Sequence, residues 1–323
     1  MEEIVPAREL PRMAWAQLSC PYDIDVPERR LAEMNDMDTL LARLAELILR
    51  HDDTLIFTAL EVGAAPIGGP PERSHRLLDY FPGSRVFAFE VDEALCKKLN
   101  RESPPGIRFF AKALGRAEEK RPFYETLAPM CSSLYEPNKP LLSLYNEFEL
   151  ADLVGVREIE TVSLDHFAEE QAIGPVDFIK IDVQGAELDI FQGGCQVLGE
   201  VVAIVSEVEF IPHYVNQPLF GDVCTQLRRD NIMFHKFLTR GTRSLAPIVL
   251  NNDPTVGTQD IWADALFIRD VVQIPQLSAK KLLKLGMLAQ MYDSPDLAFY
   301  CFRHYDALQG TNLQGEFAAL FSC

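Results

Sequence analysis

Val176-Asp-Phe-Ile-Lys-Ile-Asp182 decides the fold, and Val183-Gln-Gly185-Ala-Glu187 follows it without a break. A short apolar run of this kind, bounded by turn residues, indicates a buried strand of a parallel sheet. A helix is predicted over residues 186–192, and it ends at Gly193-Gly194, a pair typical of a helix C-terminus. The stretch therefore predicts a strand, a turn and a helix, with Asp182 presented at the turn.

Strands and helices alternate on both sides of this unit. Further strands are predicted over residues 55–62, 85–90, 107–113, 158–164, 200–208, 233–238 and 263–269. Helices are predicted over residues 74–80, 93–100 and 218–230, and residues 116–157 form a less regular insertion. This alternation predicts an α/β protein with a doubly wound, mostly parallel sheet.

Helical patterns flank the alternating region. We expect an N-terminal helical extension over residues 1–50, a ligand-binding domain over residues 51–272 and a C-terminal helical segment over residues 273–323. The last segment has the Leu, Met and aromatic spacing of two or three helices. Those helices are expected to pack on the core or on a partner, which leaves a homodimer open.

Composition narrows the classes of function. The formal net charge is −18, from 30 basic and 48 acidic residues, which argues against a nucleic-acid partner. The seven cysteines are scattered and form no zinc-ligand pattern. The chain starts with no signal segment and contains no run of about 20 apolar residues. A cytoplasmic protein without a membrane span is therefore expected.

Three predicted strands end on or near a carboxylate, where α/β sheets bind ligands. Glu61 precedes a glycine-rich loop, from Gly63 to Gly69, that lacks the second glycine of the dinucleotide fingerprint. An acidic residue there suits a ligand with an ammonium group. Glu90 can accept the hydroxyls of a ribose. Asp182, at the end of an apolar strand, needs a partner such as an amino group, a metal or a substrate proton.

These pieces resemble the FkbM family of S-adenosylmethionine-dependent methyltransferases. Residues 176–194 are similar to the family's signature nearly residue for residue. Supporting pieces follow in the family's order at residues 61–64, 86–90, 111–115, 132–134, 162–165, 207–210 and 263–269. The resemblance spans roughly residues 54–270. It implies the Rossmann-like, seven-stranded sheet of a class I methyltransferase, here with extra helices at both ends.

The resemblance also implies the cofactor, S-adenosyl-L-methionine, and the residues that hold it. The methionine and ribose side would be lined by Glu61, Gly63 and Ala65. Glu90 would hold the ribose hydroxyls, Ala113 and Leu114 would lie beside the adenine, and Asp182 would lie near the amine and the transferred methyl group. The first motif departs from the family, which usually has Asp in place of Glu61 and Asn in place of Ala65.

Methyl transfer requires an aligned nucleophile and a base for its proton. Candidate catalytic residues are Asp182, Glu207 and His213, and His166 is a further candidate base. A Mg²⁺ site on Asp165, Asp182 and Glu207 is not favoured, because no Asp-Asp or Asp-Asn pair follows the signature strand. The resemblance implies a hydroxyl acceptor on a sugar, a glycan or a secondary metabolite.

Two other classes of function stay open. An NAD-dependent oxidoreductase would also use Glu90 on a ribose, but the dinucleotide loop is missing. A non-catalytic binding or assembly protein that kept the fold is suggested by the altered Gly63–Gly69 loop and the long helical ends.

Overall fold

The computed structural model describes residues 28–65 and 71–321, with side chains from Met37 onward. The chain divides into two units, residues 1–38 and 39–323. What is described of the first unit is the start of helix α1, Glu28–His51. Asp38 lies inside this helix. The three predicted segment boundaries stay predictions.

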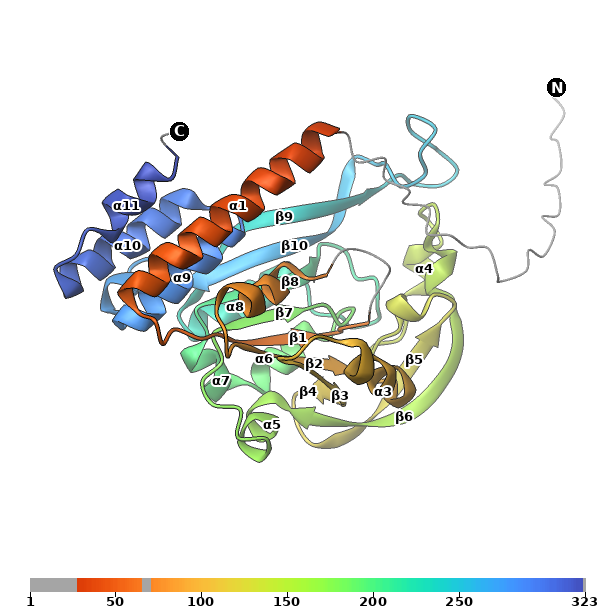
Figure 1. The fold of residues 1–323 in the computed structure, drawn as a ribbon. Coiled ribbons are helices and arrows are strands. Elements are labelled where there is room, and N and C mark those ends of the chain that lie inside the picture. Colours follow the sequence, from red (N-terminus) through yellow and green to blue (C-terminus); the bar gives the residue numbers. More distant parts are fainter. Residues whose placement is uncertain (1–27, 66–70, 322–323) are drawn as a thin grey trace, which may run out of the picture. The chain divides into compact units, whose positions relative to one another are not determined.

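A seven-stranded sheet in the order β3-β2-β1-β7-β8-β10-β9 forms the centre of the second unit, as Figure 1 shows. β3, β2, β1, β7 and β8 are parallel, and β10 runs antiparallel to both of its neighbours. The strands are β1 Thr58–Val62, β2 Arg85–Glu90, β3 Ile107–Ala111, β7 Phe178–Ile181, β8 Ala203–Glu209, β9 Ile232–Arg243 and β10 Gln259–Arg269. The predicted mostly parallel, seven-stranded sheet is confirmed.

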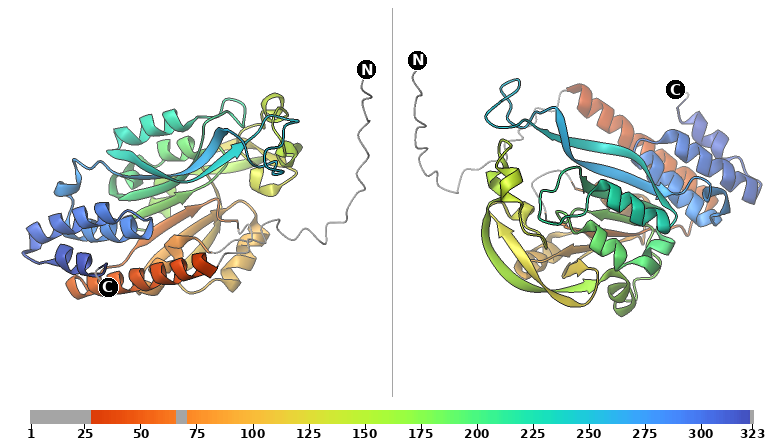
Figure 2. Two further views of the ribbon diagram at one scale, coloured as in Figure 1. Left: turned by 90° about the horizontal axis from the view of Figure 1, so that it is seen from above. Right: turned by 180° about the vertical axis from the view of Figure 1, so that it is seen from behind.

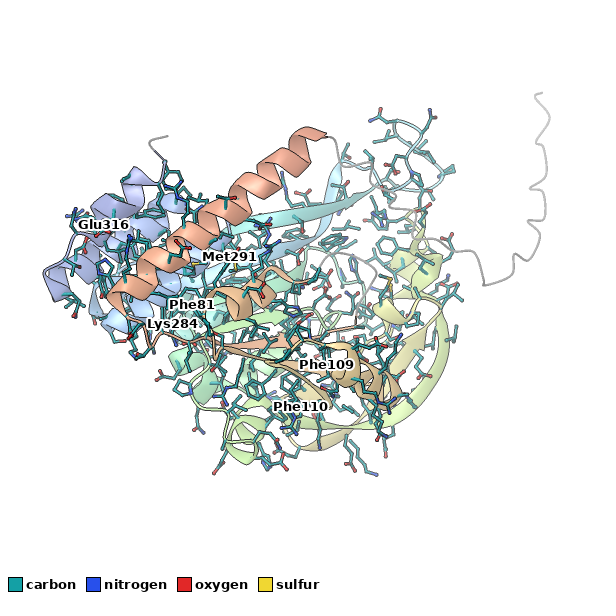
Figure 3. All side chains as sticks on the ribbon, in the orientation of Figure 1. Phe81, Phe109, Phe110, Lys284, Met291 and Glu316 are labelled. Atoms are coloured by element: carbon teal, nitrogen blue, oxygen red, sulfur yellow. The ribbon has the colours of Figure 1, made fainter. Side chains whose placement is uncertain are left out.

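Helices cover both faces of the sheet, which is therefore doubly wound (Figures 1 and 2). One face packs on α5 Leu164–Glu170, α6 Glu187–Gln192, α7 Cys195–Glu200 and α8 Phe220–Arg229. The other carries α2 Arg76–Tyr80, α3 Glu93–Glu102 and the C-terminal helices. Neighbouring side chains on β3 show the alternation: Phe109 joins the cluster under α3, whereas Phe110 stacks toward Phe87 and Phe89 (Figure 3).

A second, three-stranded sheet lies in the order β4-β6-β5. Its strands are β4 Ala113–Gly115, β5 Glu119–Thr126 and β6 Leu153–Ser163. The strand expected at residues 158–164 belongs to this sheet, not to the alternation of the main sheet. The strand expected at residues 107–113 breaks at Lys112 and continues as β4 in the second sheet. The short helices η2 Pro129–Cys131, α4 Lys139–Leu142 and η3 Phe148–Ala151 lie between β5 and β6.

Three C-terminal helices follow η4 Ile274–Gln276. They are α9 Ala279–Met291, α10 Pro295–Gln309 and α11 Leu313–Ala319. Lys284 of α9, labelled in Figure 3, donates to Asp177 at the start of β7 over 2.7 Å. Glu316 of α11 pairs with Arg50 of α1 at 3.2 Å. These helices thus pack on their own chain, and a homodimer stays a prediction. None of the helices in the described part of the chain has the length and apolar character to cross a membrane.

Candidate active site

Gly63 fixes the turn after β1. Its φ is +80°, and a Cβ built on it would lie 1.8 Å from the carbonyl oxygen of Asp182. Its N–H and that of Ala64 both donate to the carbonyl of Phe89, at 3.2 and 3.0 Å. Only glycine tolerates this close approach and this dihedral angle. The turn therefore holds the ends of β2, β1 and β7 together. The rest of the predicted loop, with Gly68 and Gly69, lies outside the described residues.

Glu61 has a partner that the sequence did not suggest. His75, at the end of η1 Arg73–His75, places its Nε2 2.6 Å from Glu61 Oε2. Burial disfavours the charged imidazolium, but the hydrogen bond and charge of Glu61 outweigh it, so the pKa of His75 is raised above 6.5. The sequence does place a histidine at the start of the helix after the glycine-rich loop. No fixed spacing links such a histidine to Glu61, so the contact was not predicted.

Lys180 lies on the same face of the sheet as Glu61, since β1 and β7 pair in the register Glu61–Lys180. It is 9% exposed, and its Nζ lies 3.3 Å from Asp182 Oδ2 and 3.8 Å from Asp264 Oδ1. Burial alone would lower the pKa of Lys180, but the charges of Asp182 and Asp264 raise it. A charged ammonium group is therefore held between Asp182, just after β7, and Asp264 in the middle of β10.

Asp182 and Glu207 are bridged by Gln184. Its Nε2 donates to Asp182 Oδ1 over 3.0 Å and to Glu207 Oε2 over 2.6 Å. Burial opposes ionisation of Asp182, but the charge of Lys180 outweighs it and lowers the pKa of Asp182. Burial, together with the charge of Asp182, raises the pKa of Glu207 well above 4.5. Of the two acids, Asp182 is therefore the one that ionises more readily.

Gln184 itself is fixed by its backbone conformation and by two hydrogen bonds. Its φ is +58°, a left-handed conformation uncommon outside glycine. Ser133 Oγ donates to its carbonyl over 2.7 Å, and Tyr214 OH donates to its Oε1 over 3.1 Å. These contacts orient the amide so that its NH₂ group faces both carboxylates. The strained turn after the signature strand is what positions the two acids together.

Two further carboxylates lie beside this pair. Glu187 is 2% exposed, and its Oε1 accepts from the N–H of Val183 and Gly185 at 2.9 and 3.3 Å. Burial raises the pKa of Glu187 to about 7 and that of Glu209 well above 4.5. Carboxylate oxygens of Glu187, Glu207 and Glu209 all lie within 4.8 Å of one another, a group that can hold a metal ion. Glu209 was missed, although its spacing from Glu207 puts both on one face of β8.

The residues expected around the nucleoside lie along the β2–β3 edge. Glu90 ends β2, accepts the N–H of Asp92 at 3.0 Å, and is paired in register with Ala111. Ala113 and Leu114 follow on β4, where Leu114 is buried. A hollow of about 530 Å³ opens beside Glu90, lined by Val91, Asp92, Glu93, Ala111 and Arg157. Another, of about 490 Å³, lies at the opposite end of the sheet around Asn231 and Asp270.

The other proposed bases and ligands lie elsewhere. His213 is buried, its ring centroid lies 5.4 Å from that of Phe148, and burial and then the charge of Arg243 lower its pKa to about 4. His166 is half-exposed and lies 3.7 Å from Glu118. Asp165 caps α7, where its oxygens accept from backbone N–H groups at 2.9 to 3.1 Å. Asp165 is therefore engaged there and not with Asp182.

The chain matches the family model described as the methyltransferase FkbM domain over residues 61–231. It is also 25% identical over 143 residues to the 2-O-methyltransferase NoeI of Sinorhizobium fredii. That match covers 42% of this chain and 57% of the relative, so the chain spans little more than half of the relative's length.

Two solved structures are similar at 10% identity. One, from Thermoplasma acidophilum, is described as a candidate methyltransferase, and the match covers 66% of this chain and 68% of the other with a TM-score of 0.30. The second is an uncharacterised protein from Burkholderia thailandensis, with 76% and 81% covered and a TM-score of 0.29. The family model covers more than half of this chain and contains Glu61, Glu90, Asp182 and Glu207. The chain belongs to the FkbM methyltransferase family.

Proposed function

We propose that this protein transfers the methyl group of S-adenosyl-L-methionine to a hydroxyl oxygen of a sugar, a glycan or a secondary metabolite. The observation that carries the proposal is the contact of Gly63 with the backbone of Asp182, which brings the first family motif against the signature motif. The name of the relative NoeI, a 2-O-methyltransferase, supports oxygen as the acceptor atom.

The residues present fit the cofactor. Glu90 ends β2, and a carboxylate at this position can accept ribose hydroxyls. Ala113 and Leu114, just past the paired Ala111, offer an apolar contact for a base. Glu61, Gly63 and Ala65 would line the methionine side. The bound cofactor would supply an electrophilic methyl group on a sulfonium.

Asp182 is the residue we propose at the reacting end. Its lowered pKa keeps it ionised near neutral pH, so it can attract a cationic group or accept the proton of an acceptor hydroxyl. Glu207, joined to Asp182 through Gln184, would keep the Gln184 amide in place beside Asp182. His213 is neutral near pH 7, but its contacts with Phe148 favour a packing role over catalysis.

Calorimetry with S-adenosylhomocysteine tests the cofactor. The full chain is expected to bind it at micromolar strength or better, and Glu90→Gln is expected to weaken binding about tenfold by losing one charged hydrogen bond. Glu102→Gln, an exposed acid at the end of α3 that does not line the hollow, is the matched control. No binding at millimolar ligand would contradict the proposal. Transfer of labelled methyl groups to a panel of saccharides then tests the acceptor.

One observation favours a second candidate, a methyltransferase fold that binds without turnover. Glu61 is already occupied by His75, and the family's usual Asn is Ala65 here. If binding of S-adenosylhomocysteine is normal while no acceptor is methylated and Asp182→Ala keeps the biological role, this second candidate is the better one.

A further inference from the structure

The ends of β7 and β8 hold more acid than base. Asp182 has Lys180, whose Nζ lies 3.3 Å away, as its counter-charge. Glu187, Glu207 and Glu209 bring carboxylate oxygens within 4.8 Å of one another. Three acids this close cannot all be ionised unless a positive group lies between them.

Neutral donors satisfy only part of this cluster. Two backbone N–H groups bind Glu187 Oε1, and the Gln184 amide binds Glu207 Oε2. Glu209 is 3% exposed, and among the described residues its Oε1 has no hydrogen-bond partner. A buried carboxylate oxygen without a partner is costly, and native proteins rarely keep one without a ligand. The unpaired oxygen of Glu209 is an observation separate from the number of acids around it, and a positive group would satisfy it.

We propose that Glu187, Glu207 and Glu209 bind one divalent, oxygen-preferring cation of the Mg²⁺, Mn²⁺ or Ca²⁺ class. Such ions take carboxylate oxygens, which are the only ligands that these three side chains offer. Bond lengths of about 2.1 Å for Mg²⁺ and about 2.4 Å for Ca²⁺ put oxygens on opposite sides of the ion about 4.2 or about 4.8 Å apart. Because oxygens of all three residues lie within 4.8 Å of one another, a single ion of this class can reach all of them.

The strained turn after β7 explains how the site is preorganised. Gln184 and Gly185 both have positive φ, +58° and +98°, and this bend aims the N–H groups of Val183 and Gly185 at one oxygen of Glu187. The proposed ion site uses Glu187, Glu207 and Glu209, so Asp182 and Lys180 remain a pair of their own. The proposal does not depend on the methyl-transfer function.

Titration of the full chain with Mn²⁺ tests this, after EDTA treatment and without cofactor, with free Mn²⁺ followed by electron paramagnetic resonance. We expect one Mn²⁺ per chain, displaced by Mg²⁺ or Ca²⁺, and at least tenfold weaker binding in Glu209→Gln. Glu160→Gln, an exposed acid on β6, should bind as the wild type does. No saturable binding at 1 mM Mn²⁺, or equal binding by Glu209→Gln, would overturn the proposal.

Two further measurements cover the remaining outcomes. If Glu209→Gln does not fold, anomalous diffraction from wild-type crystals soaked in Mn²⁺ decides the matter: a peak among the three carboxylates supports the site, and peaks only elsewhere refute it. If saturating S-adenosylhomocysteine abolishes Mn²⁺ binding, the positive group is the cofactor's ammonium and the metal site is refuted. Loss of cofactor binding with intact Mn²⁺ binding would instead count against the proposed function alone.

Discussion

The two halves of the sheet's carboxyl edge treat their acids differently. At the β1–β2 end, each carboxylate has a donor of its own: His75 for Glu61 and the Asp92 N–H for Glu90. At the β7–β8 end, four acids share Lys180, Gln184 and a few backbone N–H groups, and an oxygen of Glu209 has no partner among the described residues. At the first end Glu61 and Glu90 do not share donors, whereas at the second end several buried acids share a few donors.

Gly63 joins the two ends, so replacing it should have the largest effect. Gly63→Ala puts a Cβ 1.8 Å from the Asp182 carbonyl oxygen and forces a φ of +80° on alanine. Backbone strain and overpacking together should cost about 3 kcal/mol or more of unfolding free energy. Urea unfolding measures this.

Gly199→Ala is the control for Gly63→Ala, because its Cβ would meet nothing within 4 Å. It lies in helix α7 and should leave stability unchanged or raise it by up to about 1 kcal/mol. Equal stability of the two variants would show that the ends of β1 and β7 move independently. Gly63 would then not link the β1–β2 end to the β7–β8 end.

Lys180 tests the charge imbalance at the β7–β8 end. Lys180→Met removes the buried ammonium that contacts Asp182 and Asp264, and leaves both acids without it. Breaking a buried pair from one side costs about 3 kcal/mol. The exposed pair of Lys120 and Glu158, at 3.0 Å, is the control, and Lys120→Met should cost less than about 0.5 kcal/mol. If Lys180→Met left the free energy of unfolding unchanged, Asp182 and Asp264 would already be protonated without the ammonium.

The sequence predicted the local strand and turn structure better than the contacts between side chains that are distant in the chain. The buried strand at β7, the acid at its tip and the glycine at Gly63 follow from local patterning, and all were expected. The contact of Glu61 with His75 was not expected, because it depends on where η1 packs against the sheet. The grouping of Glu187, Glu207 and Glu209 was not expected either, because it depends on the register of β8. Sheet membership was missed for the same reason: residues 158–164 have a strand pattern, but pattern alone does not say which sheet they join.

His75 should give a smaller effect that depends on pH. Its pKa is raised in the folded chain, so the Glu61–His75 pair stabilises fully below pH 6.5 and loses that stabilisation as pH rises through the raised pKa. A charged hydrogen bond of this kind is worth about 1.5 kcal/mol. His75→Gln should therefore be less stable than wild type at pH 5.5 and nearly equal at pH 8.5.

His166→Gln is the control for the pH experiment, because His166 is half-exposed and lies 3.7 Å from Glu118. Its difference from wild type should stay near zero at both pH values. A constant difference for His75→Gln across pH would mean that His75 acts by packing, and the β1 end would then not be balanced by charge.

The smallest expected effect is at Asp92, which caps α3 beside Glu90. Its Oδ1 accepts from the N–H of Ala94 and Leu95 at 2.8 and 2.9 Å. Asp92→Ala should cost about 1 kcal/mol in urea unfolding, and Asp92→Asn, which can still cap, less than half of that. Because the cap uses neutral N–H donors, this cost should change little with pH above 5, unlike that of His75→Gln. A cost that instead follows pH, or that Asn fails to rescue, would show that Asp92 acts through the charge of Glu90. The end of β2 would then also hold acids that repel one another, and the two ends of the sheet edge would differ only in how many such acids they hold.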